Sequence, residues 1–297
     1  MRIDALQLTN FRAIESAELS FSEGFNLLVG VNGVGKTSVL DALRICFSRI
    51  LPVVSSSRSR AISFAAEDIR KGRPFVEASL AFAVGAASCQ FERREWRESI
   101  AIDDEENLEE LRRQIREQQR LSDRARNLLR DLSTTQALED TDFFEPTATV
   151  MAKAAEASSY APLVLFYGVG RSVVSRAAPT TREGGTAAAY AEALVERPMR
   201  LTHLARWLSA QAVLAEEREL SAKHLASVVG VASRFIPELT NLRPDSDKLL
   251  IDKNGMELDV AWLSEGERGT LAIAMDIARR LSQANPNLDE PTTQAGA

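Results

Sequence analysis

The sequence has few of the residues that form metal sites or disulfides. Its two cysteines, Cys46 and Cys89, lie in a helix pattern and a strand pattern and lack metal-ligand spacing. The two histidines, His203 and His224, lie alone on separate helical stretches, so neither indicates a metal centre. Cysteines used in this way are typical of core thiols in a reducing cytosol. We therefore expect free thiols and a cytoplasmic protein.

Long apolar runs and an excess of basic charge are also missing. The opening residues lack the apolar stretch of a signal peptide, and no run of about 18 apolar residues occurs. The sequence therefore predicts neither secretion nor a membrane partner. The formal net charge is −6, which excludes a protein coated in basic charge for nucleic acid. Contact with DNA would need a local basic patch, for which the arginines of 58–60 and 170–182 are weak candidates.

What the sequence does hold is a glycine-rich phosphate-loop motif. Residues 30–38 read Gly-Val-Asn-Gly-Val-Gly-Lys-Thr-Ser, the Walker A pattern. The apolar run 25–29 before it predicts a buried strand, and residues 37–45 after it have helical spacing. In that setting, backbone N–H groups and the helix N-terminus point at the phosphates of a nucleotide.

We therefore expect ATP and Mg²⁺ as ligands of this loop. Lys36 would reach the β- and γ-phosphates, and the Thr37 hydroxyl would bind the metal. The full predicted contact set of the loop is Asn32, Gly33, Gly35, Lys36, Thr37 and Ser38.

The rest of the chain alternates strand patterns with helix patterns. Strands are expected at 2–9, 15–21, 75–82, 88–93 and 162–168, with a hairpin of 249–252 and 256–260 around Asn254-Gly255. Helices are expected from the phosphate loop to Pro52, at 148–154, at about 200–216 and at about 220–235. The segment 170–186 is expected to be a basic loop.

Residues 105–132 carry a heptad-like stripe of apolar positions. Acidic residues open this segment and arginines crowd its later half, an order that suits the helix dipole. Gln118 and Ser122 interrupt the stripe. We expect a single helix laid on the body or paired with a neighbour; a solvated helix with a structural role only is the alternative.

A second motif follows the last hairpin. Residues 263–269 read Leu-Ser-Glu-Gly-Glu-Arg-Gly and lead into a helix through Leu281. Ser264 with Glu267 fits a plain capping box. The segment also resembles the signature turn of ABC-type ATPases, in which Ser264 and Gly266 take the two best-defined positions. That resemblance implies a γ-phosphate receptor that acts on the nucleotide of a second subunit.

The N-terminus resembles the heads of RecF-, Rad50- and SMC-type ATPases. Residues 3–12 match their strand followed by Asn-Phe-Arg, and the resemblance places Arg12 near the phosphates. The segments 67–70 and 166–171 resemble stand-alone bacterial AAA-family ATPases, whose relatives include the ATPase of Septu-type phage defence. The resemblance also implies a Q-loop residue that senses the γ-phosphate, for which Asp68 and Gln90 both stay open.

No Walker B element is found in the sequence, so no catalytic glutamate is assigned. Leu288-Asp289-Glu290 has the expected letters, but residues 283–287 before it do not read as a buried strand, and Pro286 lacks a donor that a central strand needs. We expect a polar loop there. The sequence thus reads as a head that ends before its catalytic strand, through an engineered boundary, a frameshift or a split protein.

Taken together, these patterns predict an α/β fold of the P-loop, ABC-type head. It would have a mixed sheet, an antiparallel β subdomain and a helical lobe with the heptad-like helix inserted. The predicted segments are 1–104 with the phosphate loop and β subdomain, 105–235 as the helical lobe, and 236–297 with the signature turn.

Two functions are in keeping with this sequence. The first is the ATP-binding head of a RecF- or Rad50-like ATPase that dimerises around ATP in DNA maintenance or phage defence. The second is a non-hydrolysing ATP sensor that recruits an effector such as a nuclease. A small-molecule kinase is disfavoured because the signature turn would then have no role.

Overall fold

The computed structural model describes residues 1–97, 113, 145–158, 160–168, 185–196, 201–246 and 248–294. Two compact units make up the chain. Residues 1–46 and 62–150 form the first, and residues 47–61 and 151–297 form the second. Each is described by itself.

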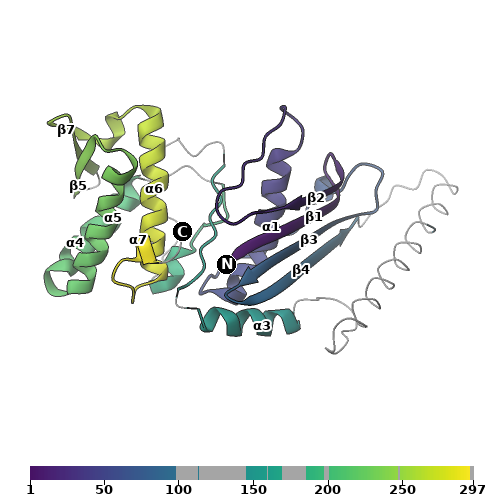
Figure 1. The fold of residues 1–297 in the computed structure, drawn as a ribbon. Coiled ribbons are helices and arrows are strands. Elements are labelled where there is room, and N and C mark those ends of the chain that lie inside the picture. The colour runs from purple at the N-terminus through teal and green to yellow at the C-terminus, as the bar shows by residue number, and fades with distance from the viewer. Residues whose placement is uncertain are drawn as a thin grey trace. The chain divides into compact units, whose positions relative to one another are not determined.

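The first unit is built on a four-stranded antiparallel sheet, shown in purple and blue in Figure 1. Its strands are β1 (Arg2–Phe11), β2 (Ile14–Ser20), β3 (Phe75–Val84) and β4 (Ala87–Trp96), in the spatial order β2-β1-β3-β4. Alternate residues of β1 and β3 are buried, including Leu6, Leu8, Leu80 and Phe82. This alternation with a period of two is what allows one face of the sheet to pack.

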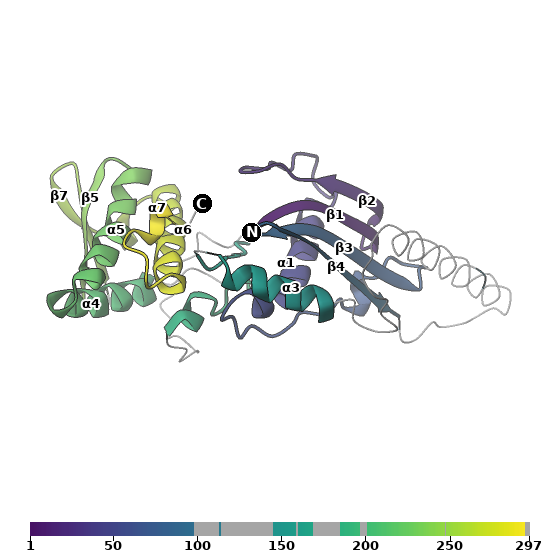
Figure 2. The ribbon, with the colours of Figure 1, turned by 60° about the horizontal axis from the view of Figure 1, so that its bottom comes forward.

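Helix α1 (Lys36–Val54) begins directly at the phosphate loop, and its first half belongs to this unit. Figure 2 shows it along one face of the sheet. Ala42, Ile45 and Cys46 on that half are almost fully buried. A short helix, η1 (Ala66–Asp68), and a single bridge between Phe11 and Ile69 fix the end of β1.

The second unit packs three helices against a small antiparallel sheet. The helices are α4 (Leu201–Glu217), α5 (Glu219–Phe235) and α6 (Glu265–Ala284); the sheet is β5 (Leu239–Asp245), β6 (Lys248–Lys253) and β7 (Met256–Asp259). Their apolar side chains form one core. Residues on both sides of the predicted segment boundary after residue 235 belong to this core. The unit also contains η3 (Gly185–Ala189), η4 (Val260–Trp262) and α7 (Pro291–Gln294), while α3 (Glu145–Glu156) spans the division between the two units.

These elements confirm the predicted α/β class and most of the predicted strands and helices. Both cysteines are free and buried, as expected. Residues 285–290 form turns without a strand, as expected for the polar loop. No helix in the described part of the chain is long and apolar enough to cross a bilayer.

Two strand predictions were wrong. Residues 25–29 form no strand, and Phe25, Leu27 and Val29 are 87%, 71% and 82% exposed. A strand requires a hydrogen-bonded neighbour, and none of the described strands pairs with this segment; both described sheets are antiparallel and lie elsewhere. Residues 162–168 likewise form no strand, although the Phe166 N–H donates to the Ala193 carbonyl at 2.8 Å.

A smaller correction concerns α1, which continues past Pro52 to Val54. Proline at this place costs the helix only a bond in its last turn. The helix predicted over 105–132 lies, except for residue 113, outside the described residues. Most of the basic loop predicted over 170–186 lies outside them too.

Candidate nucleotide-binding site

The phosphate loop has the backbone shape that its glycines permit. Gly33 and Gly35 have φ of +85° and +100°, values that residues with a Cβ rarely adopt. A Cβ on Gly35 would also lie 3.3 Å from Cγ1 of Ile14. The hydrogen-bond pattern of helix α1 begins at the loop, where the Val39 N–H donates to the Gly35 carbonyl at 3.0 Å. The free N–H groups of the helix N-terminus therefore open directly onto the loop, where an anion can take them.

Lys36 lies folded across this loop. Its Nζ donates to the carbonyls of Gly30 at 2.7 Å and Val31 at 2.8 Å. A phosphate oxygen is a stronger partner for an ammonium than a neutral carbonyl, because both groups then carry charge. The loop residues thus fit a nucleotide: Gly33, Gly35 and Lys36 would hold the phosphates, and the exposed Thr37 offers its hydroxyl for Mg²⁺. The half-buried Ser38 follows Thr37 in the helix as a further nucleotide contact.

Arg12 stands in the turn between β1 and β2 and joins that turn to α1. Its Nε donates to Asp68 Oδ1 at 2.8 Å, and its Nη1 donates to Asp41 Oδ2 at 2.6 Å. The backbone N–H of Arg12 donates to the carbonyl of Asp68 at 2.7 Å. Its side chain is 35% exposed, and guanidinium donors remain for a further anion. The structure therefore fixes Arg12 relative to the helix of the phosphate loop.

The two residues left open for the γ-phosphate sensor lie in different places. Asp68 is buried, and both its carboxylate oxygens are engaged, one by Arg12 and one by the Ala65 N–H at 2.9 Å. Gln90 is exposed on the edge strand β4 and donates to Ser79 Oγ at 3.2 Å. Asp68 is thus the one of the two that contacts another predicted site residue.

The signature turn lies in the second unit and forms a complete capping box. Ser264 caps α6, its Oγ accepting from the Glu267 N–H at 3.3 Å, while Glu267 Oε2 accepts from the Ser264 N–H at 3.2 Å. Lys253 of β6 donates to Glu267 Oε1 at 2.6 Å. The hydrogen bonds from Lys253 and Ser264 lower the pKa of Glu267 to about 2. Ser264 and Gly266 are exposed, and nothing lies within 4 Å of a Cβ built on Gly266.

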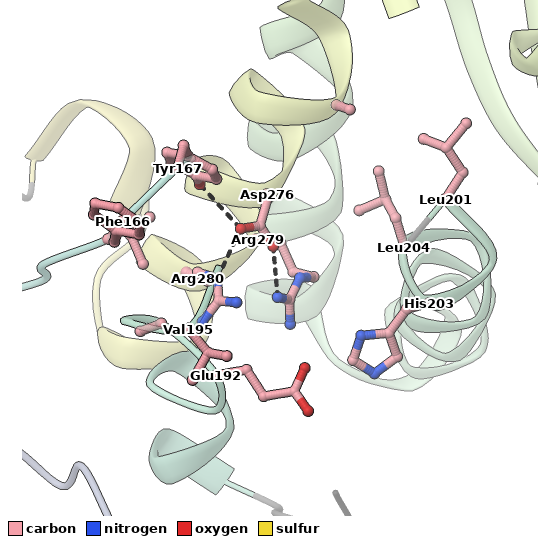
Figure 3. A pocket seen from close by; sticks show the side chains of 13 residues that line it. Phe166, Tyr167, Glu192, Val195, Leu201, His203, Leu204, Asp276, Arg279 and Arg280 are labelled. Carbon is pink, nitrogen blue, oxygen red and sulfur yellow. Dashed lines mark hydrogen bonds and ion pairs between the residues drawn. The ribbon is translucent and has the colours of Figure 1, made fainter. Parts of the chain in front are cut away.

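Sequence reasoning missed a buried charge cluster on α6. Asp276 accepts hydrogen bonds from Arg279 at 2.7 Å, from Arg280 at 2.8 Å and from the Tyr167 hydroxyl at 3.0 Å, as Figure 3 shows. Arg280 also donates to the carbonyls of Ala189 and Ala191. The only signal in the sequence is the spacing of Asp276, Arg279 and Arg280, which puts three charges on one helix face.

The charges of this cluster are nearly removed from water. The side chains of Arg279 and Arg280 are 6% and 10% exposed, and that of Asp276 is 16% exposed. Burial by itself would raise the pKa of the Asp276 carboxyl, but the charges of Arg280 and Arg279 outweigh it and hold the pKa at about 2. A cavity of about 90 Å³ borders the cluster and is also lined by Glu192 and His203.

His224 has a structural role in the same unit. Its Nδ1 lies 2.8 Å from Ser282 Oγ and its Nε2 lies 2.6 Å from the Leu288 carbonyl oxygen. These two bonds tie α5 to α6 and to the turn that follows it. Both ring nitrogens are thereby engaged within the protein.

Comparison with known proteins points to the same N-terminal residues. Residues 1–71 match the AAA ATPase domain family. A probable ATPase of retron Ec83 from Escherichia coli is 38% identical over 79 residues, which are 26% of this chain and 15% of that protein. The DNA replication and repair protein RecF of Klebsiella pneumoniae is 58% identical over 43 residues, 14% of this chain and 12% of RecF.

A further relative and a solved structure are also similar to parts of this chain. The DNA double-strand break repair Rad50 ATPase of Thermoplasma acidophilum is 35% identical over 85 residues, 29% of this chain and 8% of Rad50. The matched segments therefore span 15% or less of these relatives' lengths. A RecF–ATP structure covers 100% of this chain and 83% of its own at 12% identity, with a TM-score of 0.38. Residues 1–71 are thus similar to the AAA ATPase domain family, and segments within the chain are similar to RecF and to the Rad50 ATPase.

Proposed function

We propose that this chain binds ATP with Mg²⁺ as the head of a RecF- or Rad50-like ATPase, and that two copies close around the nucleotide. The phosphate loop carries this proposal, because its two left-handed glycines and the Lys36 ammonium converge at the N-terminus of α1. Relatives that are named for DNA repair or belong to a retron support a role in DNA maintenance or phage defence. DNA is the proposed target of the head, and its site of action is the cytoplasm.

The proposed nucleotide contacts come from the phosphate loop and from Arg12. Gly33, Gly35 and Lys36 hold the phosphates, with Asn32 and Ser38 as further contacts of the nucleotide. Thr37 holds Mg²⁺, which offsets the charge of the phosphates. Arg12, which Asp41 and Asp68 hold beside the same helix, is a further contact of the phosphates in this proposal. Binding then draws Lys36 from the loop carbonyls to the phosphates, where its charge is better matched.

The signature turn supports the assembly of two copies. Ser264 and Gly266 are exposed at the N-terminus of a 20-residue helix, where N–H groups favour an anion. Gly266 has open space around it, so packing within the chain does not require a glycine there. A phosphate carried by a second copy would explain both the exposure and the glycine.

A second candidate is an ATP sensor that does not hydrolyse and recruits an effector such as a nuclease. One observation favours it: Glu290, the glutamate of the Leu288-Asp289-Glu290 string, lies in an exposed turn and accepts a bond from Thr293. It does not end a buried strand, as a glutamate that polarises the attacking water would.

The deciding experiment measures ATP binding, self-association and turnover in one set of variants. Lys36→Ala is expected to abolish Mg·ATP binding, while Lys71→Ala, an exposed lysine in a turn of the same unit, leaves it unchanged. Ser264→Arg is expected to block ATP-dependent dimers in sedimentation velocity while monomers still bind ATP. Retention of ATP binding in Lys36→Ala would refute the site. Dimers without phosphate release would favour the sensor over the ATPase.

A further inference from the structure

The turn that begins α6 contains a contact that a plain capping box does not need. A capping box exchanges bonds between the N-cap and N3 side chains and each other's backbone N–H groups. Here Ser264 Oγ also donates its own proton to Glu267 Oε2 at 2.7 Å, while Lys253 donates to Oε1 at 2.6 Å. Both carboxylate oxygens are therefore engaged, one by a hydroxyl and the other by an ammonium.

The position of the hydroxyl proton decides whether Ser264 is able to bind a phosphate. A serine hydroxyl has one proton and two lone pairs. While the O–H of Ser264 points at Glu267, the hydroxyl presents only lone pairs to an incoming phosphate oxygen. A carboxylate also stands 2.7 Å from the Ser264 oxygen and repels that phosphate. Binding therefore requires the O–H to turn away from Glu267 and the carboxylate charge to be offset.

Lys253 meets the second requirement from a fixed position. It ends β6 and pairs with Leu239 of β5 and with Met256 of β7, so the sheet holds its backbone on both sides. The side chains of Lys253 and Glu267 are 25% and 22% exposed. At that burial, water and salt screen the pair less than they screen an open surface pair.

We propose that Lys253 is a positioning residue of the signature turn. By binding the Glu267 carboxylate through Oε1, it offsets the negative charge beside Ser264. The γ-phosphate of a nucleotide carried by a second copy of this chain is then able to approach, and the Ser264 hydroxyl turns from Glu267 to donate to it. The inference rests on the proposed function and adds the residue that prepares Ser264 for its ligand. Lys253 itself does not contact the phosphate.

The first test compares ATP-driven dimerisation of wild type and Lys253→Met by sedimentation velocity with Mg·ATP. Methionine keeps an unbranched side chain and removes the charge. The dimer dissociation constant is expected to rise about tenfold, while monomer ATP binding through Lys36 stays unchanged. Lys253→Arg is expected to restore the dimer. Lys223→Met is the matched control, because Lys223 also pairs with carboxylates, of Glu219 and Asp289, but away from the turn.

The second test repeats the comparison in a Glu267→Gln background. Glutamine still accepts from Ser264 but carries no charge, so Lys253→Met is expected to have no further effect there. A role of Lys253 that does not pass through the Glu267 carboxylate would weaken the dimer equally in both backgrounds, and that result would overturn the inference. An unchanged dimer in Lys253→Met alone would overturn it as well. If wild type forms no ATP-dependent dimer, or one that survives Lys36→Ala, the proposed function is refuted and this inference with it.

Discussion

Asp276 is expected to be the most sensitive charge in the second unit. Asp276→Asn keeps the shape of the side chain but leaves Arg279 and Arg280 buried without their carboxylate. Breaking a buried ion pair from one side costs about 3–5 kcal/mol in general. The pKa gives a lower figure: a fall from 3.8 to about 2 corresponds to about 2 kcal/mol. We therefore expect Asp276→Asn to lower the free energy of unfolding by about 2–5 kcal/mol.

The pH dependence of this effect has a defined sign. The pKa of Asp276 is lower in the folded protein than in the unfolded chain, so its stabilisation is complete above about pH 4 and lost as the pH falls towards 2. The difference in stability between wild type and Asp276→Asn should therefore be constant from pH 5 to pH 7 and shrink below pH 4.

Urea denaturation followed by circular dichroism measures both quantities. Asp289→Asn is the matched control, because Asp289 also pairs with a cation but is 62% exposed, where a pair contributes about 1 kcal/mol or less. A loss below about 1 kcal/mol for Asp276→Asn, or a gap from wild type that persists at pH 2, would contradict the structure of the cluster.

Three further substitutions test other parts of the structure. Gly35→Ala forces φ near +100° on a residue with a Cβ, and that Cβ presses on Ile14. We expect the free energy of unfolding to fall by about 1–3 kcal/mol and Mg·ATP binding to weaken in calorimetry. Unchanged values would contradict the loop geometry. Ser264→Ala removes the N-cap side chain of α6 and is expected to lower the free energy of unfolding by about 1 kcal/mol in thermal denaturation. A fall above about 3 kcal/mol would show that the Ser264 side chain is needed for packing and not only as a cap. Tyr190→Phe removes the hydroxyl that donates to the Pro162 carbonyl at 3.0 Å. The free energy of unfolding in urea should fall by about 1–3 kcal/mol, because a buried acceptor loses its donor. An unchanged free energy would show that water replaces the hydroxyl.

Local patterns were enough to predict the sheet of the first unit and the start of α6. Strand β3 alternates buried and half-buried residues almost without interruption, and the turn at Gly85 follows from the gap between two such patterns. Ser264 and Glu267 stand three residues apart before an apolar helix, which is a complete signal for a capping box. In both cases the determining contacts are close in the sequence.

The wrong predictions concern apolar runs whose burial depends on distant partners. Residues 25–29 and 162–168 read as core strands because they are apolar, but a strand also needs a neighbour that supplies backbone hydrogen bonds. The Asp276 cluster was missed for a related reason. Asp276 lies 109 residues from Tyr167 in the sequence, and Arg280 lies 91 residues from Ala189, so no local pattern indicates these contacts.

The phosphate loop is therefore supported unevenly within its unit. On its helix side, the Gly35 carbonyl accepts from the Val39 N–H of α1, and Asp41 on the same helix accepts from Arg12. On its other side, residues 25–29 make no ladder with any described strand, and the carbonyls of Gly30 and Val31 are held by the Lys36 ammonium. Lys36 thus has two functions that exclude each other, since its bonds to the loop carbonyls must break when it turns to a phosphate. The affinity of the loop for ATP is therefore set by the difference between the bonds that Lys36 makes to the phosphates and the two carbonyl bonds that it gives up.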